Sequence, residues 1–133
     1  MSSPKILVVD DDPDLVRALR LRLRANNYEV ATATDGYAAI AQAQKERPAL
    51  IILDLGLPAG DGFQVLERLQ NIDALACVPV IVLSARDPQA NEDRALKAGA
   101  SAFFQKPADN EELLNVIRVS LGPGTAQQAA WPS

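Results

Sequence analysis

The sequence contains no histidine and only one cysteine, Cys77. A single cysteine cannot form a disulfide bond within the chain, and the absence of histidine excludes the common zinc sites and histidine-based catalytic triads. The chain cannot carry a phosphohistidine of its own either. Carboxylates, lysines and hydroxyls remain for any chemistry, and we expect a reduced, cytoplasmic protein.

Positive charge and long apolar runs are also scarce. Thirteen Lys and Arg residues face seventeen Asp and Glu, so a net charge of -4 offers no basic field for nucleic acid or an anionic membrane. Apolar runs such as 50–53 are far shorter than the ~20 residues of a membrane span, and no signal peptide is visible. In 133 residues we expect one domain over 1–122 and a flexible tail or linker remnant over 123–133.

Short apolar runs alternate five times with segments of helical periodicity. The predicted strands are 5–9, 29–33, 50–53, 79–83 and 102–105. The predicted helices are 13–25, 36–47, a third marked by Phe63, Leu66 and Leu69, 88–98, and a fifth between Asp109 and Gly122. Predicted N-caps are Asp12, Asp61, Asp87 and Asp109. The alternation predicts an α/β fold, in which a parallel five-stranded sheet forms a doubly wound, flavodoxin-like sandwich; the strand order 2-1-3-4-5 is taken from that fold class.

Polar residues interrupt the apolar runs where the predicted strands end. They are Asp10 and Asp11 after the first strand, Asp54 after the third, Ser84 after the fourth and Lys106 after the fifth. In the expected order the first and third strands are neighbours, which brings the three aspartates together at one edge of the sheet. Three adjacent carboxylates repel one another unless a cation compensates, and their oxygens suit Mg²⁺.

Each of these residues also has an ordinary explanation. Asp11 fits a solvated turn, Lys106 a solvated surface, and Ser84 a capping box with Asp87. Five suitable groups on one edge of one sheet are improbable as independent features. We therefore favour a functional cluster.

Four motifs carry a resemblance to a known family. They are Lys5-Ile6-Leu7-Val8-Val9-Asp10-Asp11-Asp12, Leu53-Asp54-Leu55-Gly56-Leu57-Pro58-Ala59-Gly60-Asp61-Gly62, Val82-Leu83-Ser84-Ala85-Arg86, and Gly99-Ala100 with Phe104-Gln105-Lys106-Pro107. Over residues 5–121 the chain resembles the receiver domain of bacterial response regulators, the phosphorylated signalling modules of two-component systems.

The resemblance implies a switch that accepts a phosphoryl group on Asp54 from a sensor histidine kinase or phosphotransfer protein. In that family pattern Asp10, Asp11, Asp54 and the Gly56 carbonyl bind Mg²⁺, and Ser84 and Lys106 contact the phosphoryl group. Phe103, which alone would be read as a core residue, matches an aromatic switch. The fourth helix, fifth strand and fifth helix would form the surface that controls a downstream target or an effector domain absent from this chain. The Lys106-Pro107 bond is often cis in the family.

The sequence departs from the family pattern at Gly56 and Gly60, where bulkier residues are common, and at Ala102, where Asp is frequent. Two other functions are considered. A haloacid-dehalogenase-like phosphohydrolase would use Asp10 as its nucleophile, but a cap domain and a late acidic metal motif are missing. A nucleotide- or flavin-binding module of the same architecture would need a glycine-rich phosphate loop after the first strand, and none is present.

Overall fold

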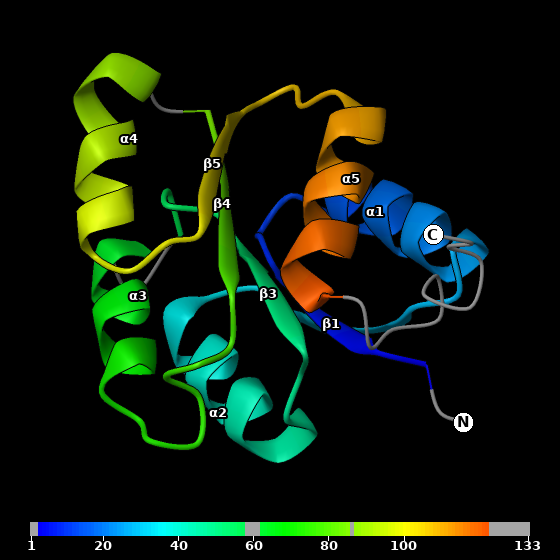
Figure 1. Cartoon of the computed structure of the whole chain (residues 1–133), viewed down its shortest axis with the longest axis horizontal. Coiled ribbons are helices and arrows are strands. Elements are labelled where there is room, and N and C mark those ends of the chain that lie inside the picture. Colours follow the sequence, from blue (N-terminus) through cyan, green and yellow to red (C-terminus); the bar gives the residue numbers. More distant parts are fainter. Residues whose placement is uncertain (1–2, 58–61, 86, 123–133) are drawn as a thin grey trace.

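The computed structural model describes residues 3–57, 62–85 and 87–122, with five strands and five helices alternating along the chain (Figure 1). The strands are β1 (Lys5–Val9), β2 (Glu29–Ala33), β3 (Leu50–Leu53), β4 (Val80–Ser84) and β5 (Ala102–Gln105). The helices are α1 (Pro13–Ala25), α2 (Gly36–Glu46), α3 (Gly62–Gln70), α4 (Pro88–Lys97) and α5 (Asn110–Leu121). The predicted tail, 123–133, lies outside the described residues.

All strand pairs are parallel, and the order is β2-β1-β3-β4-β5, as predicted. At the centre of the sheet Val9 lies opposite Leu53, and the Asp54 amide donates a hydrogen bond to the Val9 carbonyl at 3.0 Å. The chain order reverses at this β1–β3 junction, where ligands of open α/β sheets usually bind. The residue that follows each of these two strands is therefore brought to the same edge.

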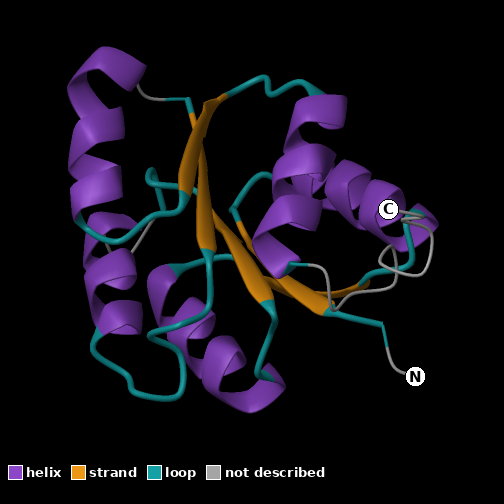
Figure 2. Ribbon diagram, viewed as in Figure 1, coloured by secondary structure: helices purple, strands orange, loops and turns teal. Residues whose placement is uncertain are grey.

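Alternate residues of each central strand point to opposite faces of the sheet, and both faces are covered by helices (Figure 2). Leu7, Ile51 and Val82 belong to the core beneath α2, α3 and α4, whereas Val8 and Ile52 belong to the core beneath α1 and α5. All residues of β3 and β4 are buried, as continuous apolar runs in a parallel sheet require.

Side-chain caps fix where the helices begin. The Asp12, Asp87 and Asp109 carboxylates accept hydrogen bonds from backbone amides in the first turns of α1, α4 and α5, which confirms these predicted N-caps. Asp35 does the same for α2. Asp61 lies outside the described residues.

Several predicted boundaries were wrong by one residue: β4 begins at Val80 rather than at 79, and α2 and α4 end at Glu46 and Lys97 rather than at 47 and 98. The fourth strand includes Ser84, because that residue still pairs with Gln105 of β5. Gly62, expected in a loop although it follows the predicted N-cap Asp61, is the first residue of α3. The Lys106-Pro107 bond is cis, as the resemblance predicts. No helix within the described ranges is long and apolar enough to cross a membrane.

Candidate functional site at the carboxyl edge of the sheet

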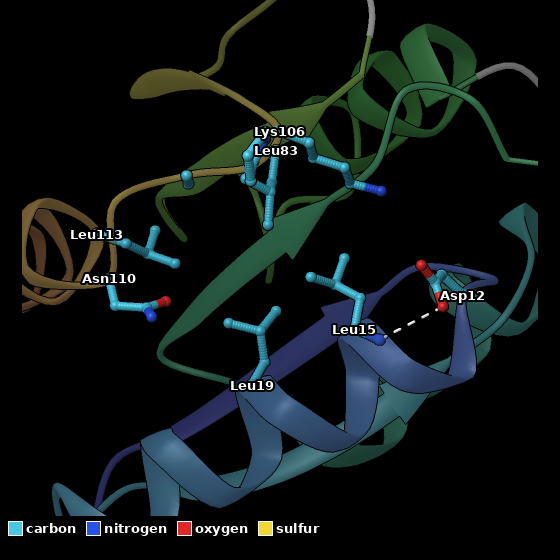
Figure 3. Close-up of a pocket in the computed structure, with 9 residues that line it drawn as sticks. Asp12, Leu15, Leu19, Leu83, Lys106, Asn110 and Leu113 are labelled. Atoms are coloured by element: carbon cyan, nitrogen blue, oxygen red, sulfur yellow. Dashed lines mark hydrogen bonds between the residues drawn. The ribbon is translucent and has the colours of Figure 1, made fainter.

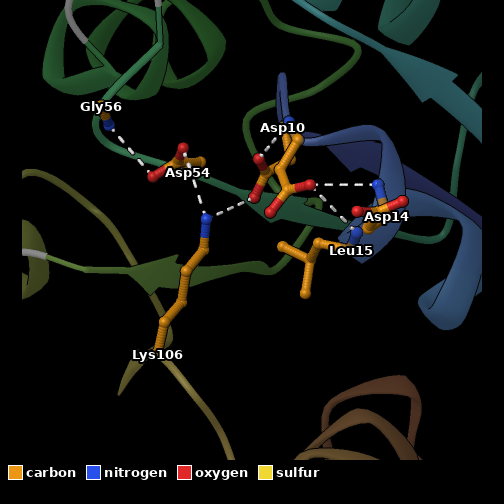
Figure 4. A network of polar contacts seen from close by, with 7 residues as sticks. Asp10, Asp14, Leu15, Asp54, Gly56 and Lys106 are labelled. Carbon is orange, nitrogen blue, oxygen red and sulfur yellow. Dashed lines mark hydrogen bonds and ion pairs between the residues drawn. The ribbon is translucent and has the colours of Figure 1, made fainter.

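Asp10, Asp54 and Lys106 meet at the carboxyl edge of the sheet, where β1, β3 and β5 end (Figure 4). The Lys106 Nζ atom lies 2.7 Å from Asp10 Oδ2 and 3.6 Å from Asp54 Oδ2. Both carboxylates are buried, with exposed fractions of 2% for Asp10 and 7% for Asp54. One ammonium group thus bridges two buried carboxylates that come from distant parts of the sequence.

Asp11 completes an acidic cluster on the solvent side. One carboxylate oxygen from each of Asp10, Asp11 and Asp54 lies within 4.8 Å of the other two. Asp11 is exposed, whereas the other two side chains are buried. The cluster is therefore open to an ion from solvent on one side and closed by the sheet on the other.

Backbone amides orient the two buried carboxylates. The Asp12 amide donates to Asp10 Oδ1 at 2.9 Å, and the Gly56 amide donates to Asp54 Oδ1 at 3.1 Å. A Cβ atom on Gly56 would lie 3.7 Å from Asp54 Oδ1 and 3.9 Å from Asp54 Oδ2, so this residue directly flanks the carboxylate. In each case one oxygen is held by the protein and the second faces Lys106.

Burial and charge act against each other in this cluster. Burial raises the pKa of the Asp10 carboxyl above its ordinary value, although Lys106 and the Asp12 amide favour the ionised form. Burial lowers the pKa of the Lys106 ammonium, but the Asp10 and Asp54 carboxylates outweigh it, and the pKa is raised overall. Lys106 therefore stays protonated at neutral pH, and its single positive charge serves two adjacent carboxylates.

The residues present fit Mg²⁺. Although Asp10 Oδ2 is paired with Lys106, it is buried without receiving a well-aligned hydrogen bond. Asp10 Oδ2 can therefore coordinate a metal ion, and a second cation would reduce the excess negative charge of the three carboxylates. The available donors are carboxylate oxygens, which Mg²⁺ prefers.

Ser84 is the last residue of β4, at the same edge, whereas Phe103 lies inside β5, opposite Val82. Ser84 is fully buried, and its carbonyl accepts a hydrogen bond from the Lys106 amide at 2.8 Å, which ties β4 to the lysine. Phe103 is half-buried and packs against the core beneath α2, α3 and α4. The sequence therefore correctly predicted that Asp10, Asp11, Asp54 and Lys106 lie together. Ser84 is linked to Lys106 by the backbone hydrogen bond between these two residues.

A groove opens beside the cluster, between α1 and the start of α5 (Figure 3). Its volume is about 480 Å³, and its walls include Leu15 and Leu19 of α1, Leu83 of β4 and Leu113 of α5. Lys106 lines the same groove. Lys106 thus separates an apolar groove from the acidic cluster.

Sequence reasoning missed the part that Gly62 plays at this edge. The Gly62 amide donates to the Leu55 carbonyl at 3.1 Å, and a Cβ atom there would lie 2.4 Å from Leu55 Cα and 2.7 Å from the Asp54 carbonyl oxygen. Only a glycine allows α3 to begin directly on the backbone that carries Asp54. The glycine itself was visible, but its surrounding cluster of Gly and Pro residues indicated only a loop.

The sequence matches the family described as the response regulator receiver domain over residues 6–118. It is 40% identical over 121 residues to the transcriptional regulatory protein KdpE of Mycobacterium tuberculosis; the match covers 91% of this chain and 52% of KdpE. The chain thus spans about half the length of that curated relative.

Solved receiver domains share the fold. The Francisella response regulator 1452 receiver domain superposes with a TM-score of 0.83 at 28% identity, covering 90% of this chain and 97% of that one. The receiver domain of sensor histidine kinase PA1611 from Pseudomonas aeruginosa superposes with a TM-score of 0.83 at 28% identity, and the match covers 91% of this chain and 99% of that one. That structure has a magnesium ion coordinated in its active-site cleft. These matches do not favour the phosphohydrolase alternative. With the family pattern matched over nearly all of the described chain, this protein belongs to the response regulator receiver domains of two-component systems.

Proposed function

We propose that this chain is a phosphorylation-dependent switch, with Asp54 as the residue that accepts a phosphoryl group. The observation that carries the proposal is the position of Asp54: its carboxylate is 3.6 Å from the Lys106 ammonium and close to two further carboxylates that can hold a cation. The receiver unit spans residues 1–122. The donor is a cytoplasmic sensor histidine kinase or phosphotransfer protein.

Asp54 is a better acceptor than Asp10. Asp10 makes the shorter contact with Lys106, 2.7 Å against 3.6 Å, and is the more buried of the two. Its carboxylate is thus paired with the Lys106 ammonium more closely than that of Asp54 is. Asp54 Oδ1 is held by the Gly56 amide, which leaves Oδ2 as the oxygen available to attack phosphorus.

The transfer forms an acyl phosphate. An Asp54 oxygen bonds to phosphorus as the bond between phosphorus and the donor imidazole nitrogen breaks, and the imidazole leaves with that electron pair. Lys106 pairs with the transferred group, and the Ser84 hydroxyl donates to one of its oxygens. Hydrolysis returns the Asp54 carboxylate and inorganic phosphate, so the protein catalyses only its own phosphorylation and dephosphorylation.

Mg²⁺ would balance the negative charge that phosphorylation adds to the site. Phosphorylation replaces one negative charge by about two, next to Asp10 and Asp11. A bound Mg²⁺ supplies the positive charge that Lys106 alone cannot provide. Asp10, Asp11, Asp54 and the Gly56 carbonyl are the proposed ligands.

The output is a changed surface over α4, β5 and α5. Ser84 at the end of β4 and Phe103 on β5 are the proposed switch residues that link the phosphoryl group to that surface. The target is a protein or an effector domain outside this chain. Direct nucleic-acid binding by this domain is not proposed, because its net charge is -4.

Intact-mass spectrometry after incubation with a small phosphodonor tests the proposal. We expect the added mass of one phosphoryl group, its loss in Asp54→Asn, and its loss when a chelator removes Mg²⁺. Asp14→Asn is the matched control, since Asp14 is an exposed aspartate in the first turn of α1. Phosphate mapped to Asp10, or labelling that a chelator does not affect, would contradict the assignment.

A further inference from the structure

Helix α4 buries fewer residues than α3 or α5. Ala95 is its only buried residue, and most of its other side chains are exposed. Helices α3 and α5 bury five and three residues, respectively. Because apolar burial is the main force that docks a surface helix, α4 depends more on its remaining contacts than the other two helices do.

The most specific of those contacts is between Arg94 and Phe63 of α3. The Arg94 guanidinium carbon lies 3.7 Å from the centre of the Phe63 ring, which is cation–π geometry. Next to this contact the two helices enclose a cleft of about 460 Å³, lined by polar side chains that include Glu67, Gln70 and Lys97. Arg94 therefore bridges a gap that apolar packing does not fill.

Phe63 is in turn fixed to the acceptor strand. It follows Gly62, whose amide is hydrogen-bonded to the Leu55 carbonyl and whose Cα packs against the Asp54–Leu55 backbone with no space for a side chain. The Phe63 ring is buried, with 1% exposed. The first turn of α3 is thus attached to the backbone of Asp54, and Arg94 of α4 contacts that turn.

We propose that Arg94 is a positioning residue, whose contact with the Phe63 ring holds α4 in the arrangement of the unphosphorylated protein. This inference rests on the proposed function, in which the surface that includes α4 changes when Asp54 is phosphorylated. A contact biases a two-state equilibrium only if it differs between the states. In this proposal α4 gives up the Arg94–Phe63 contact when it moves, so the contact opposes activation.

Arg94→Met tests the proposal, because methionine keeps an apolar stem over the ring and removes the charge. Lys97→Met is the matched control, because it removes a positive charge from the same cleft. The only ion pair it breaks among the described residues is the exposed one between Lys97 and Asp93. The measured quantity is the concentration of beryllofluoride, in the presence of Mg²⁺, that half-saturates the NMR change at Asp54. Loss of an exposed cation–π contact corresponds to a change of about two- to fivefold in this half-saturating concentration.

We expect the half-saturating concentration of Arg94→Met to be about two- to fivefold lower than that of the wild-type protein. The value for Lys97→Met should equal the wild-type value, and the value for Arg94→Lys should lie between those of wild type and Arg94→Met. Amide hydrogen exchange of α4 in the unphosphorylated protein should quicken in Arg94→Met only. An unchanged or higher half-saturation concentration in Arg94→Met, or an equal decrease in Lys97→Met, overturns the role of Arg94. If wild-type protein does not bind beryllofluoride at Asp54, the proposed function fails and this inference fails with it; if only the Arg94 effect is missing, the proposed function stands.

Discussion

At the scale of single residues, Gly62 is the described glycine whose added methyl group would lie closest to backbone atoms. A Cβ atom there would lie 2.4 Å from Leu55 Cα and 2.7 Å from the Asp54 carbonyl oxygen. Both neighbours are backbone atoms of the buried strand end and cannot rotate away. We predict that Gly62→Ala lowers the free energy of unfolding by about 1–3 kcal/mol, the usual cost of overpacking. Urea denaturation measures this loss.

Gly56→Ala is the control for that experiment. Its Cβ atom would meet only the Asp54 carboxylate oxygens, at 3.7 and 3.9 Å, which is ordinary contact. The free energy of unfolding should then change by less than about 0.5 kcal/mol. Equal stability of the Gly62→Ala and wild-type proteins would show that α3 can shift away from the acceptor strand, so that Phe63 would not be fixed to the backbone of Asp54.

At the scale of secondary-structure elements, the end of β4 should communicate with β5 through Ser84 and Phe103. A phosphoryl oxygen offers Ser84 a charge-assisted hydrogen bond that the unmodified carboxylate does not offer in that position. Movement of Ser84 vacates space that the half-buried Phe103 ring can fill, since Phe103 has no hydroxyl to keep in water. We predict that Ser84→Ala keeps most of the phosphorylation but loses the change at Phe103.

NMR of phenylalanine-labelled protein with and without beryllofluoride is the measurement, because the chain contains only three phenylalanines. Ser84→Thr, which retains the hydroxyl, is the matched control and should behave as wild type. If the Phe103 ring signals do not move in wild-type protein on activation, this switch is wrong for this chain. If they move equally in Ser84→Ala, the hydroxyl has no part in it.

The elements themselves could largely be predicted from the sequence. Strands β3 and β5 have the predicted bounds because polar residues or prolines end their apolar runs, and Asp12, Asp87 and Asp109 mark helix starts through their capping preference. The predicted N-cap Asp61 places the start of α3 at Gly62, but the close contact of Gly62 with the Asp54–Leu55 backbone could not be predicted, since it depends on how α3 packs against the sheet. The Arg94–Phe63 contact depends on the distance between two helices, which hydrophobic periodicity does not encode.

At the scale of the whole molecule, the site exists because the sheet order brings distant strand ends together. Asp10 and Asp54 are 44 positions apart in sequence, and the parallel pairing of β1 with β3 makes them neighbours. Lys106 arrives from β5, two strands away from β3, and reaches both carboxylates with its long side chain. The polar residue types at the strand ends were enough to predict the cluster, but only once a strand order had been assumed.

The clustered carboxylates repel one another, and a bound cation should reduce this repulsion. Burial raises the pKa of Asp10, so its ionised form is disfavoured in the fold, and Lys106 supplies one positive charge for three clustered carboxylates. We therefore predict that Mg²⁺ stabilises the folded protein, by about 1.4 kcal/mol when its concentration is ten times the dissociation constant. Thermal unfolding in the presence of Mg²⁺ or of a chelator measures this as a shift in Tm.

Asp11→Asn should abolish most of that shift while leaving the metal-free protein as stable as wild type or slightly more so, because Asp11 is exposed and its charge is repelled by Asp10 and Asp54. Asp14→Asn, also exposed but outside the cluster, should keep the full shift. A Tm that does not respond to Mg²⁺ in wild-type protein would show that Lys106 alone neutralises the cluster. An equal shift in Asp11→Asn would instead remove Asp11 from the ligand set and leave Asp10 and Asp54 as the carboxylates that hold the ion.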